Sequence, residues 1–149
     1  MTIILRAAAG LLCVTLAAQP ALAVEIEPGM WQDNETGDVN GKVQPPKVST
    51  DCISPQDAKD PVKTAQASMK DMDTKQCGKF DIKQSGNQIL LALKCSDPKQ
   101  GAMEISVVWT FLDAQHTTSV AKSVMSFGGQ AITSNLKTES KWIAAACKK

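Results

Sequence analysis

Hydrophobic and polar residues alternate through most of the chain after Cys77. The clearest example is Met103–Phe111, where Met, Ile, Val, Trp and Phe occupy every second position. A period of two is typical of strands that bury one face of a sheet. Residues typical of turns separate the strands at Ser85–Gln88, Asp113–Thr117 and Gly128–Gly129. The pattern therefore predicts an antiparallel meander.

The pattern before Cys77 predicts two further strands and a helical segment. Glu25–Asp38 and Val48–Ile53 are predicted as strands, and a loop with two prolines separates them. Ser54 followed by Pro55 is typical of a helix N-terminus. Apolar residues at helical spacing continue to Met72, so we expect one or two short helices there. The predicted fold is mainly β: a single curled antiparallel sheet, a meander or half-barrel, with a short helical insertion.

The first 23 residues have the features of a secretory signal peptide. Arg6 precedes an apolar run, Ala7–Ala18, and Ala21-Leu22-Ala23 has the A-x-A form of a cleavage site. The run is shorter than the roughly 20 residues needed to span a bilayer. We therefore predict that residues 1–23 are removed and that residues 24–149 form a single domain. We expect this domain to be periplasmic or secreted, with no stable membrane anchor.

Four cysteines would remain in the mature chain, and an oxidising compartment predicts two disulfides among them: Cys52, Cys77, Cys95 and Cys147. A two-residue loop at Gly86-Asn87 would set Ile82 opposite Leu91. The same register places Cys77 and Cys95 on opposite faces of the hairpin, where they cannot bond. A three-residue loop would bring these cysteines together but would set charged residues against apolar ones. Burial favours the first register, so we expect Cys52–Cys77 and Cys95–Cys147.

Charge excludes some classes of partner. Arg6 is the only arginine among the 16 basic residues, so the mature chain would carry 15 lysines against 15 acidic residues. A neutral chain without arginine lacks the bidentate fork that reads phosphates and bases. It also lacks the positive excess that drives binding to nucleic acid. We therefore expect no nucleic-acid partner.

No residue pattern in the chain is typical of a catalytic or metal site. The single histidine, His116, lies in a predicted turn, where we expect it to be solvated. The cysteines form no C-x-x-C knuckle, and Asp71-Met72-Asp73 lacks the further oxygen ligands of a calcium loop. Met69 and Met72 are expected to pack in the core rather than to bind copper. We expect a protein that is not an enzyme and needs no cofactor.

Several short motifs occur in an order that resembles a known family. They are Pro28-Gly29-Met30-Trp31, Cys52-Ile53-Ser54-Pro55 with Ala58, Cys77, Ser85-Gly86-Asn87, Cys95, and Lys141-Trp142 before Cys147. In this order the chain resembles the domain-of-unknown-function 3617 family of small exported proteobacterial proteins. The resemblance covers nearly all of the mature chain, and it departs at Met30, where that family usually has leucine. It implies a periplasmic or secreted location and supplies no activity or site residues.

An apolar surface is the remaining candidate for function. A curled sheet would gather six large side chains in a groove: Met103, Ile105, Val107, Trp109, Met125 and Phe127. Such a groove suits a lipid, an acyl chain or another apolar small molecule, and methionine adapts well to varied ligands. The sequence therefore favours a binding module.

Two alternatives stay open at this point. The first is a protein–protein interaction module, such as an inhibitor of an envelope hydrolase, acting through the loop at Asp113–Thr117 or the loop at Ser126–Gln130. The second is a structural envelope protein without a ligand. In each case we expect a monomer or weakly associating chain whose partner is an apolar small molecule or an envelope protein.

Overall fold

The structure is a computed structural model that describes residues 25–64, 77–78, 80–97 and 101–147. The predicted signal peptide at residues 1–23 lies outside the described residues. So do Met69, Met72 and Asp71-Met72-Asp73, the sequence candidates for metal binding.

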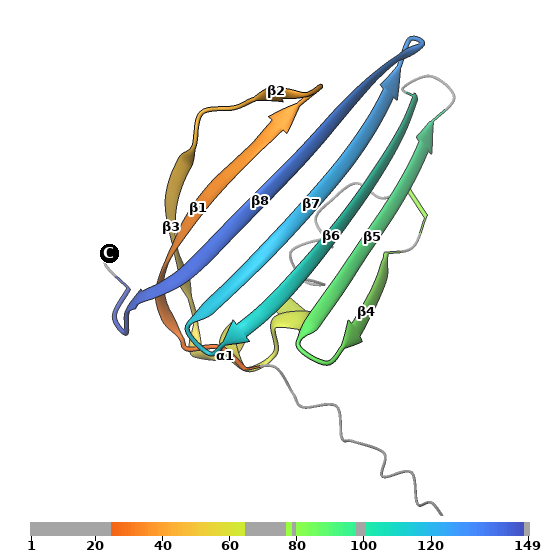
Figure 1. Ribbon diagram of the computed structural model, residues 1–149. Helices are drawn as coiled ribbons and strands as arrows, with labels where there is room; N and C mark the ends of the chain where they lie inside the picture. Colours follow the sequence, from red (N-terminus) through yellow and green to blue (C-terminus); the bar gives the residue numbers. More distant parts are fainter. Residues whose placement is uncertain (1–24, 65–76, 79, 98–100, 148–149) are drawn as a thin grey trace, which may run out of the picture.

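Eight strands form one antiparallel sheet (Figure 1). The strands are β1 Gly29–Val39, β2 Lys42–Val43, β3 Lys47–Ile53, β4 Asp81–Ser85, β5 Gln88–Asp97, β6 Gly101–Asp113, β7 His116–Phe127 and β8 Gln130–Ala144. Their order is β2-β1-β8-β7-β6-β5-β4, and β3 pairs with β1 on the same side as β2. Strands β4 to β8 are the predicted meander. The prediction of a mainly β domain with one curled sheet is confirmed.

The first strand of the sheet lies beside the last one. β1 pairs with β8 along nearly its whole length, with Asp33 opposite Ser140 and Val39 opposite Ser134. β1 pairs with β3 on its other side. This position between β3 and β8 was not evident from the sequence, because these strands are far apart in the chain.

A short helix lies against one face of the sheet, as predicted. Helix α1, Pro55–Lys59, begins where the Ser54 hydroxyl oxygen accepts a hydrogen bond from the Asp57 amide, at 3.2 Å. Helical residues resume at Pro61–Thr64. Figure 1 views the sheet with α1 behind it. We call the face that α1 covers the inner face and the opposite face the outer face.

The core lies on the inner face. It is built around three buried side chains, Ile89, Leu91 and Phe111, with Trp109 and Val62 packed against them. Ile89 has no exposed surface at all. Because side chains alternate along each strand, the residues next to these point to the outer face and to solvent. The helical insertion therefore covers the most apolar part of the sheet.

The predicted disulfide pairing is wrong, because the bonds are Cys52–Cys147 and Cys77–Cys95. The register of the hairpin itself was predicted correctly, with Ile82 opposite Leu91 and a two-residue loop at Gly86-Asn87. In an unbroken ladder that register would set Cys77 opposite Ser96.

The ladder instead shifts by one residue between Gly78 and Asp81. Asp81 pairs with Ala92, whereas the Gly78 amide donates to the Lys94 carbonyl and Cys77 lies directly opposite Cys95. The shift brings both sulfurs to the same face, so the argument from opposite faces does not hold at Cys77.

The second bond follows from the position of β1. Cys52 of β3 lies opposite Met30 of β1, and Met30 also lies opposite Ala144 at the end of β8. Cys147 follows three residues after Ala144 and so reaches Cys52 across the start of β1, with 5.6 Å between the two Cα atoms. This bond ties the edge strand β3 to the C-terminus.

The N-terminal end of β1 is held by two tryptophans and a glycine. Trp31 is 2 % exposed and lies opposite Trp142. Both indole N–H groups donate to backbone carbonyls just before β1, Trp31 to Glu27 at 2.8 Å and Trp142 to Pro28 at 3.0 Å. Gly29 has a φ of 133°, and a Cβ atom there would overlap the Ala144 carbonyl oxygen.

Removing the Cys52–Cys147 bond is expected to cost more stability than removing Cys77–Cys95. The two bonds close loops of 95 and 18 residues. Loop entropy alone gives about 4–5 kcal/mol for the longer loop and about 3 kcal/mol for the shorter one. Urea unfolding of the two double Cys→Ser variants measures both losses. Equal losses, or a larger loss for Cys77–Cys95, would contradict this ranking.

Gly29→Ala is expected to lower the free energy of unfolding by at least about 2 kcal/mol, since it combines a strained φ with an overlap against backbone. Gly86→Ala is the matched control, because Gly86 also has a positive φ, 57°, with open space where the Cβ would lie. The control should lose about 1 kcal/mol. Similar losses in the two variants would mean that the approach of Ala144 is not the constraint.

Candidate functional site

A cavity of about 340 Å³ lies between the inner face and the helical insertion. β1, β3, β6, β7 and β8 form its floor, and Asp57, Pro61 and Thr64 lie on the helical side. Its volume falls within the range of about 300–1,000 Å³ that is typical of small-molecule sites.

Aromatic side chains form the apolar wall of the cavity. Trp31, Trp109 and Phe111 all line it, together with Ile26 and Ile53. The rings of Trp109 and Phe111 lie 6.0 Å apart between centroids at a tilt of 39°, which is a favourable geometry for an aromatic pair. The wall is therefore held in place by the same contacts that build the core.

A row of polar side chains crosses the floor of the cavity. Asp33 on β1 lies opposite Ser140 on β8, and Ser140 lies opposite Thr117 on β7. Asp51 on β3 lies opposite Trp31 and also lines the cavity. Thr117 is 4 % exposed.

Asp57 is the third carboxylate of the lining, and its hydrogen bonds are made within the helical insertion. It accepts hydrogen bonds from the Ser54 hydroxyl at 2.7 Å and the Thr64 hydroxyl at 3.4 Å.

The segment before β1 closes one end of the cavity. The Ile26 amide donates to the Ala58 carbonyl of α1 at 3.1 Å, and the Glu27 amide donates to the Ala114 carbonyl at 2.8 Å. This segment thus connects the helix to the turn between β6 and β7. Cys52 also lines the cavity, so the Cys52–Cys147 bond holds its β3 side.

The structure places the six residues of the predicted groove on the inner face but not in one pocket. Met103 lies opposite Met125, at the far end of β6 from Trp109. Met125 and Phe127 are 42 % and 66 % exposed. Of the six, Trp109 alone is among the described residues that line the cavity.

The sequence patterns did not identify the cavity residues that β1, β3 and β7 supply, which include Trp31, Asp33, Asp51 and Thr117. Trp31 stood in a recognised motif, but that motif did not show which strand it faced. These residues come together only because β1 pairs with β8. Alternation within a single strand does not show which strands pair.

The family model described as "Protein of unknown function (DUF3617)" matches residues 26–147. The chain belongs to the DUF3617 family. This confirms the resemblance stated above. No curated protein and no solved structure matches the chain.

Several of the motifs that carried the resemblance meet at one place in this DUF3617 domain, while Ser85-Gly86-Asn87, Cys77 and Cys95 lie at the β4–β5 hairpin. Pro28 precedes β1, Gly29 begins it, and Trp142 lies opposite Trp31. Cys52 and Cys147 form a disulfide beside them. These motifs thus mark the junction of β1, β3 and β8, which forms part of the floor of the cavity.

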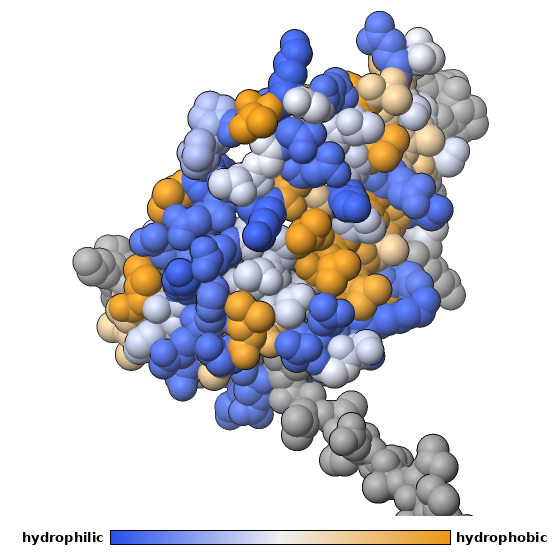
Figure 2. Space-filling model, in the orientation of Figure 1, coloured by the Kyte–Doolittle hydropathy of each residue, from blue (hydrophilic) through white to orange (hydrophobic). Residues whose placement is uncertain are grey.

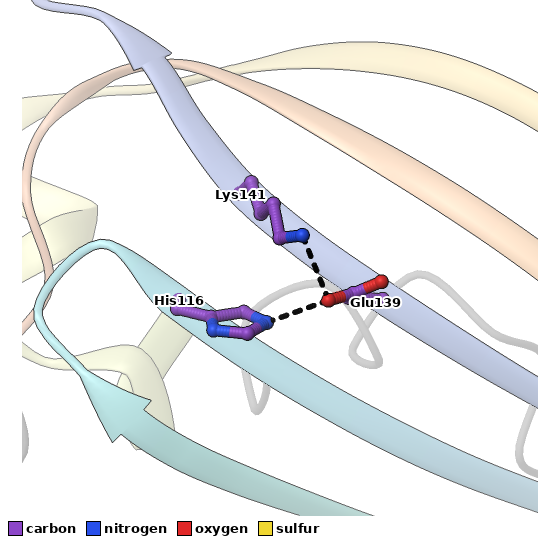
Figure 3. Close-up of polar contacts among 3 residues, drawn as sticks. All are labelled: His116, Glu139 and Lys141. Atoms are coloured by element: carbon purple, nitrogen blue, oxygen red, sulfur yellow. Dashed lines mark hydrogen bonds and ion pairs between the residues drawn. The ribbon is translucent and has the colours of Figure 1, made fainter.

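The single histidine of the DUF3617 domain lies on the outer face, away from the cavity. His116 begins β7, and its Nε2 atom lies 3.0 Å from Oε1 of Glu139 (Figure 3). The Lys141 ammonium lies 3.0 Å from the same oxygen. The expected solvated turn histidine is therefore half-buried and paired. Hydrogen bonds from Lys141, and next from His116, hold the pKa of Glu139 below its usual value.

The cysteines, the arrangement of possible metal ligands and the helices of the domain bear on its location and on the sites it can form. Cys52, Cys77, Cys95 and Cys147 all form disulfides, which are typical of an oxidising compartment outside the cytoplasm. Among the described residues, no group of three or more His, Cys, Asp or Glu could hold a metal ion. No helix in the described part of the chain is long and apolar enough to cross a membrane.

Glu139→Gln is expected to lower the thermal unfolding midpoint at neutral pH and to have no effect in strong acid. The pKa of Glu139 is lowered in the folded state. Its ionised form therefore stabilises the fold above the unfolded-state pKa, and this contribution is lost as the pH falls through the folded-state pKa. Melting curves of the unaltered protein and the variant between pH 7 and about pH 2 measure the difference between their unfolding midpoints.

Glu104→Gln is the control for this variant. Glu104 also lies on the outer face, but it pairs with one lysine, Lys94, at 2.9 Å. The Glu104→Gln variant should show a smaller fall in the unfolding midpoint at neutral pH, because a single exposed ion pair contributes little to stability. If the fall in the Glu139→Gln midpoint stayed constant into strong acid, it would not come from the ionised carboxylate, and the prediction would be wrong.

Proposed function

We propose that this protein is an exported, non-catalytic binding module of the cell envelope whose cavity holds a small, largely apolar molecule. The observation that carries the proposal is the cavity of about 340 Å³ lined by Trp31, Trp109 and Phe111, with Asp57 of α1 on its helical side. Aromatic side chains with a few polar groups are the usual lining of a small-molecule site. The two disulfides support an oxidising compartment.

The nature of the lining favours binding over catalysis. Nucleophilic catalysis needs a nucleophile and a base within hydrogen-bonding reach. Among the described residues at the cavity, Asp57 contacts the hydroxyl of Ser54, but Ser54 caps α1 with the same oxygen. His116 lies on the other face and is paired with Glu139. The rigid wall and the floor are therefore best suited to holding a ligand.

Native mass spectrometry of mature protein from its own envelope is expected to show a bound mass that disappears on denaturation. Ser140→Leu should reduce that bound fraction at least about tenfold, because the larger side chain enters the cavity from its floor and excludes the ligand. The measurement is the ratio of bound to free protein in the native spectrum.

Ser106→Leu is the matched control for Ser140→Leu. This substitution adds the same side-chain volume, but on the exposed outer face of β6. The Ser106→Leu variant should therefore keep the bound mass. A bare mass in several preparations of the unaltered protein would contradict the proposal.

A protein–protein role, such as inhibition of an envelope hydrolase, is the second candidate. Apolar side chains on the outer face favour it, since the exposed Leu90 and Val120 lie on either side of the half-buried Val108 across β5, β6 and β7. Figure 2 shows apolar side chains gathered on this face within a polar surface. Phe127 at the β7–β8 turn is also exposed. A bare native mass would favour this candidate, or the third one, a structural envelope protein without a ligand.

A further inference from the structure

The cavity contains negative charge that an apolar ligand alone does not explain. Three carboxylates line it, from Asp33, Asp51 and Asp57, and the described lining contains no lysine, arginine or histidine. Asp51 is exposed and the other two are half-buried, so water reaches part of this charge. Three carboxylates around one cavity nevertheless attract a cation and repel an anion. The arrangement therefore favours a positive ligand.

Two of the carboxylates have no partner within the described protein. Asp51 lies opposite Trp31 and Asp33 lies opposite Ser49, so the two aspartates are diagonal neighbours on the same face of β1 and β3. Such neighbours lie about 7–8 Å apart between Cα atoms. Asp57 differs, since hydroxyls of Ser54 and Thr64 already bond to it. Asp33 and Asp51 are therefore the pair that is left for a ligand.

Hydroxyl groups add hydrogen-bonding capacity to the lining. Thr117 and Ser140, on neighbouring strands, both line the cavity. A hydroxyl both donates and accepts, so either group can bond to a polar atom of a ligand.

The aromatic wall favours an organic cation over a metal ion. Trp31, Trp109 and Phe111 line the same cavity as the two free carboxylates. Aromatic faces attract ammonium groups, and tryptophan does so most strongly. A metal ion would gain nothing from an apolar wall, whereas an ammonium ion with an apolar body matches both parts of the lining.

We propose that the cavity binds an organic ammonium ion with an apolar body, its charge beside Asp33 and Asp51 and its body against Trp31 and Trp109. This inference rests on the proposed function, because it names the ligand class of the same cavity. A zwitterionic lipid headgroup fits less well, since it would bring a phosphate close to the carboxylates. The expected ligand is therefore a free amine or quaternary ammonium compound.

Four probes with the same octyl chain test the charge preference by isothermal titration calorimetry, each below its micelle-forming concentration. They are octyltrimethylammonium, octyldimethylamine oxide, octylphosphocholine and octanesulfonate. The cation is expected to bind at least about tenfold more tightly than the neutral amine oxide, and the sulfonate most weakly. The preference for the cation should shrink as salt is added, because exposed charge interactions are screened.

The double variant Asp33→Asn/Asp51→Asn tests the assigned residues. It should lose at least about tenfold in affinity for the cation and keep its affinity for the amine oxide, since only the charge changes. Asp81→Asn is the control, because Asp81 lies on the outer face in an ion pair with Lys83 at 2.7 Å. Thermal melting without ligand should show that the double variant is folded, with no fall in its midpoint.

The outcomes separate this inference from the proposed function. Equal binding of the cation and the amine oxide would overturn the charge preference and leave the apolar site in place. Equal or tighter binding of octylphosphocholine would replace the free amine with a lipid headgroup. No binding of any probe would overturn both proposals. An unchanged cation affinity in the double variant would show that Asp33 and Asp51 are not the site.

Discussion

The pairing of β1 with β8 is the interaction on which the rest of the structure depends. It places the first strand of the fold next to the last, through a close approach of Gly29 to Ala144 and the opposed tryptophans Trp31 and Trp142. A strand at this position brings β3 into the sheet as well. Without this pairing the meander of β4 to β8 would still alternate correctly, but it would have no cavity floor on the β1 side.

The same junction gives the cavity its two kinds of lining. β1 supplies Trp31 to the wall and Asp33 to the floor, two residues apart and hence on one face. The meander supplies Trp109 and Phe111 from β6, on the same inner face. Because the aromatic wall is shared with the core, its position is fixed by packing, whereas the carboxylates of β1 and β3 are positioned by strand register. The apolar and the charged parts of the lining thus lie side by side, although packing positions the first and strand register positions the second.

Local patterns predicted the elements well and the long-range contacts poorly. Alternation located β6 and the hairpin loop at Gly86-Asn87, because these depend on neighbours in the chain. The disulfides depended on two features that alternation does not report. One is the register shift before Asp81, and the other is the position of β1 between Cys52 and the C-terminus. Asp33 and Asp51 were missed for the second reason, since only strand pairing makes them neighbours.

The distribution of charge over the two faces explains why the cavity carboxylates are distinctive in this chain. Basic and acidic residues are nearly equal in number, 16 to 15, so a lysine is available for most carboxylates. The ion pairs among the described residues lie on the outer face, where Lys83, Lys94 and Lys141 pair with Asp81, Glu104 and Glu139. Lysines near solvent keep their hydration while they pair, but a lysine beside the aromatic wall would lose it. Asp33 and Asp51 have no lysine partner among the described residues, so a cationic ligand in the cavity would not compete with a lysine for their charge.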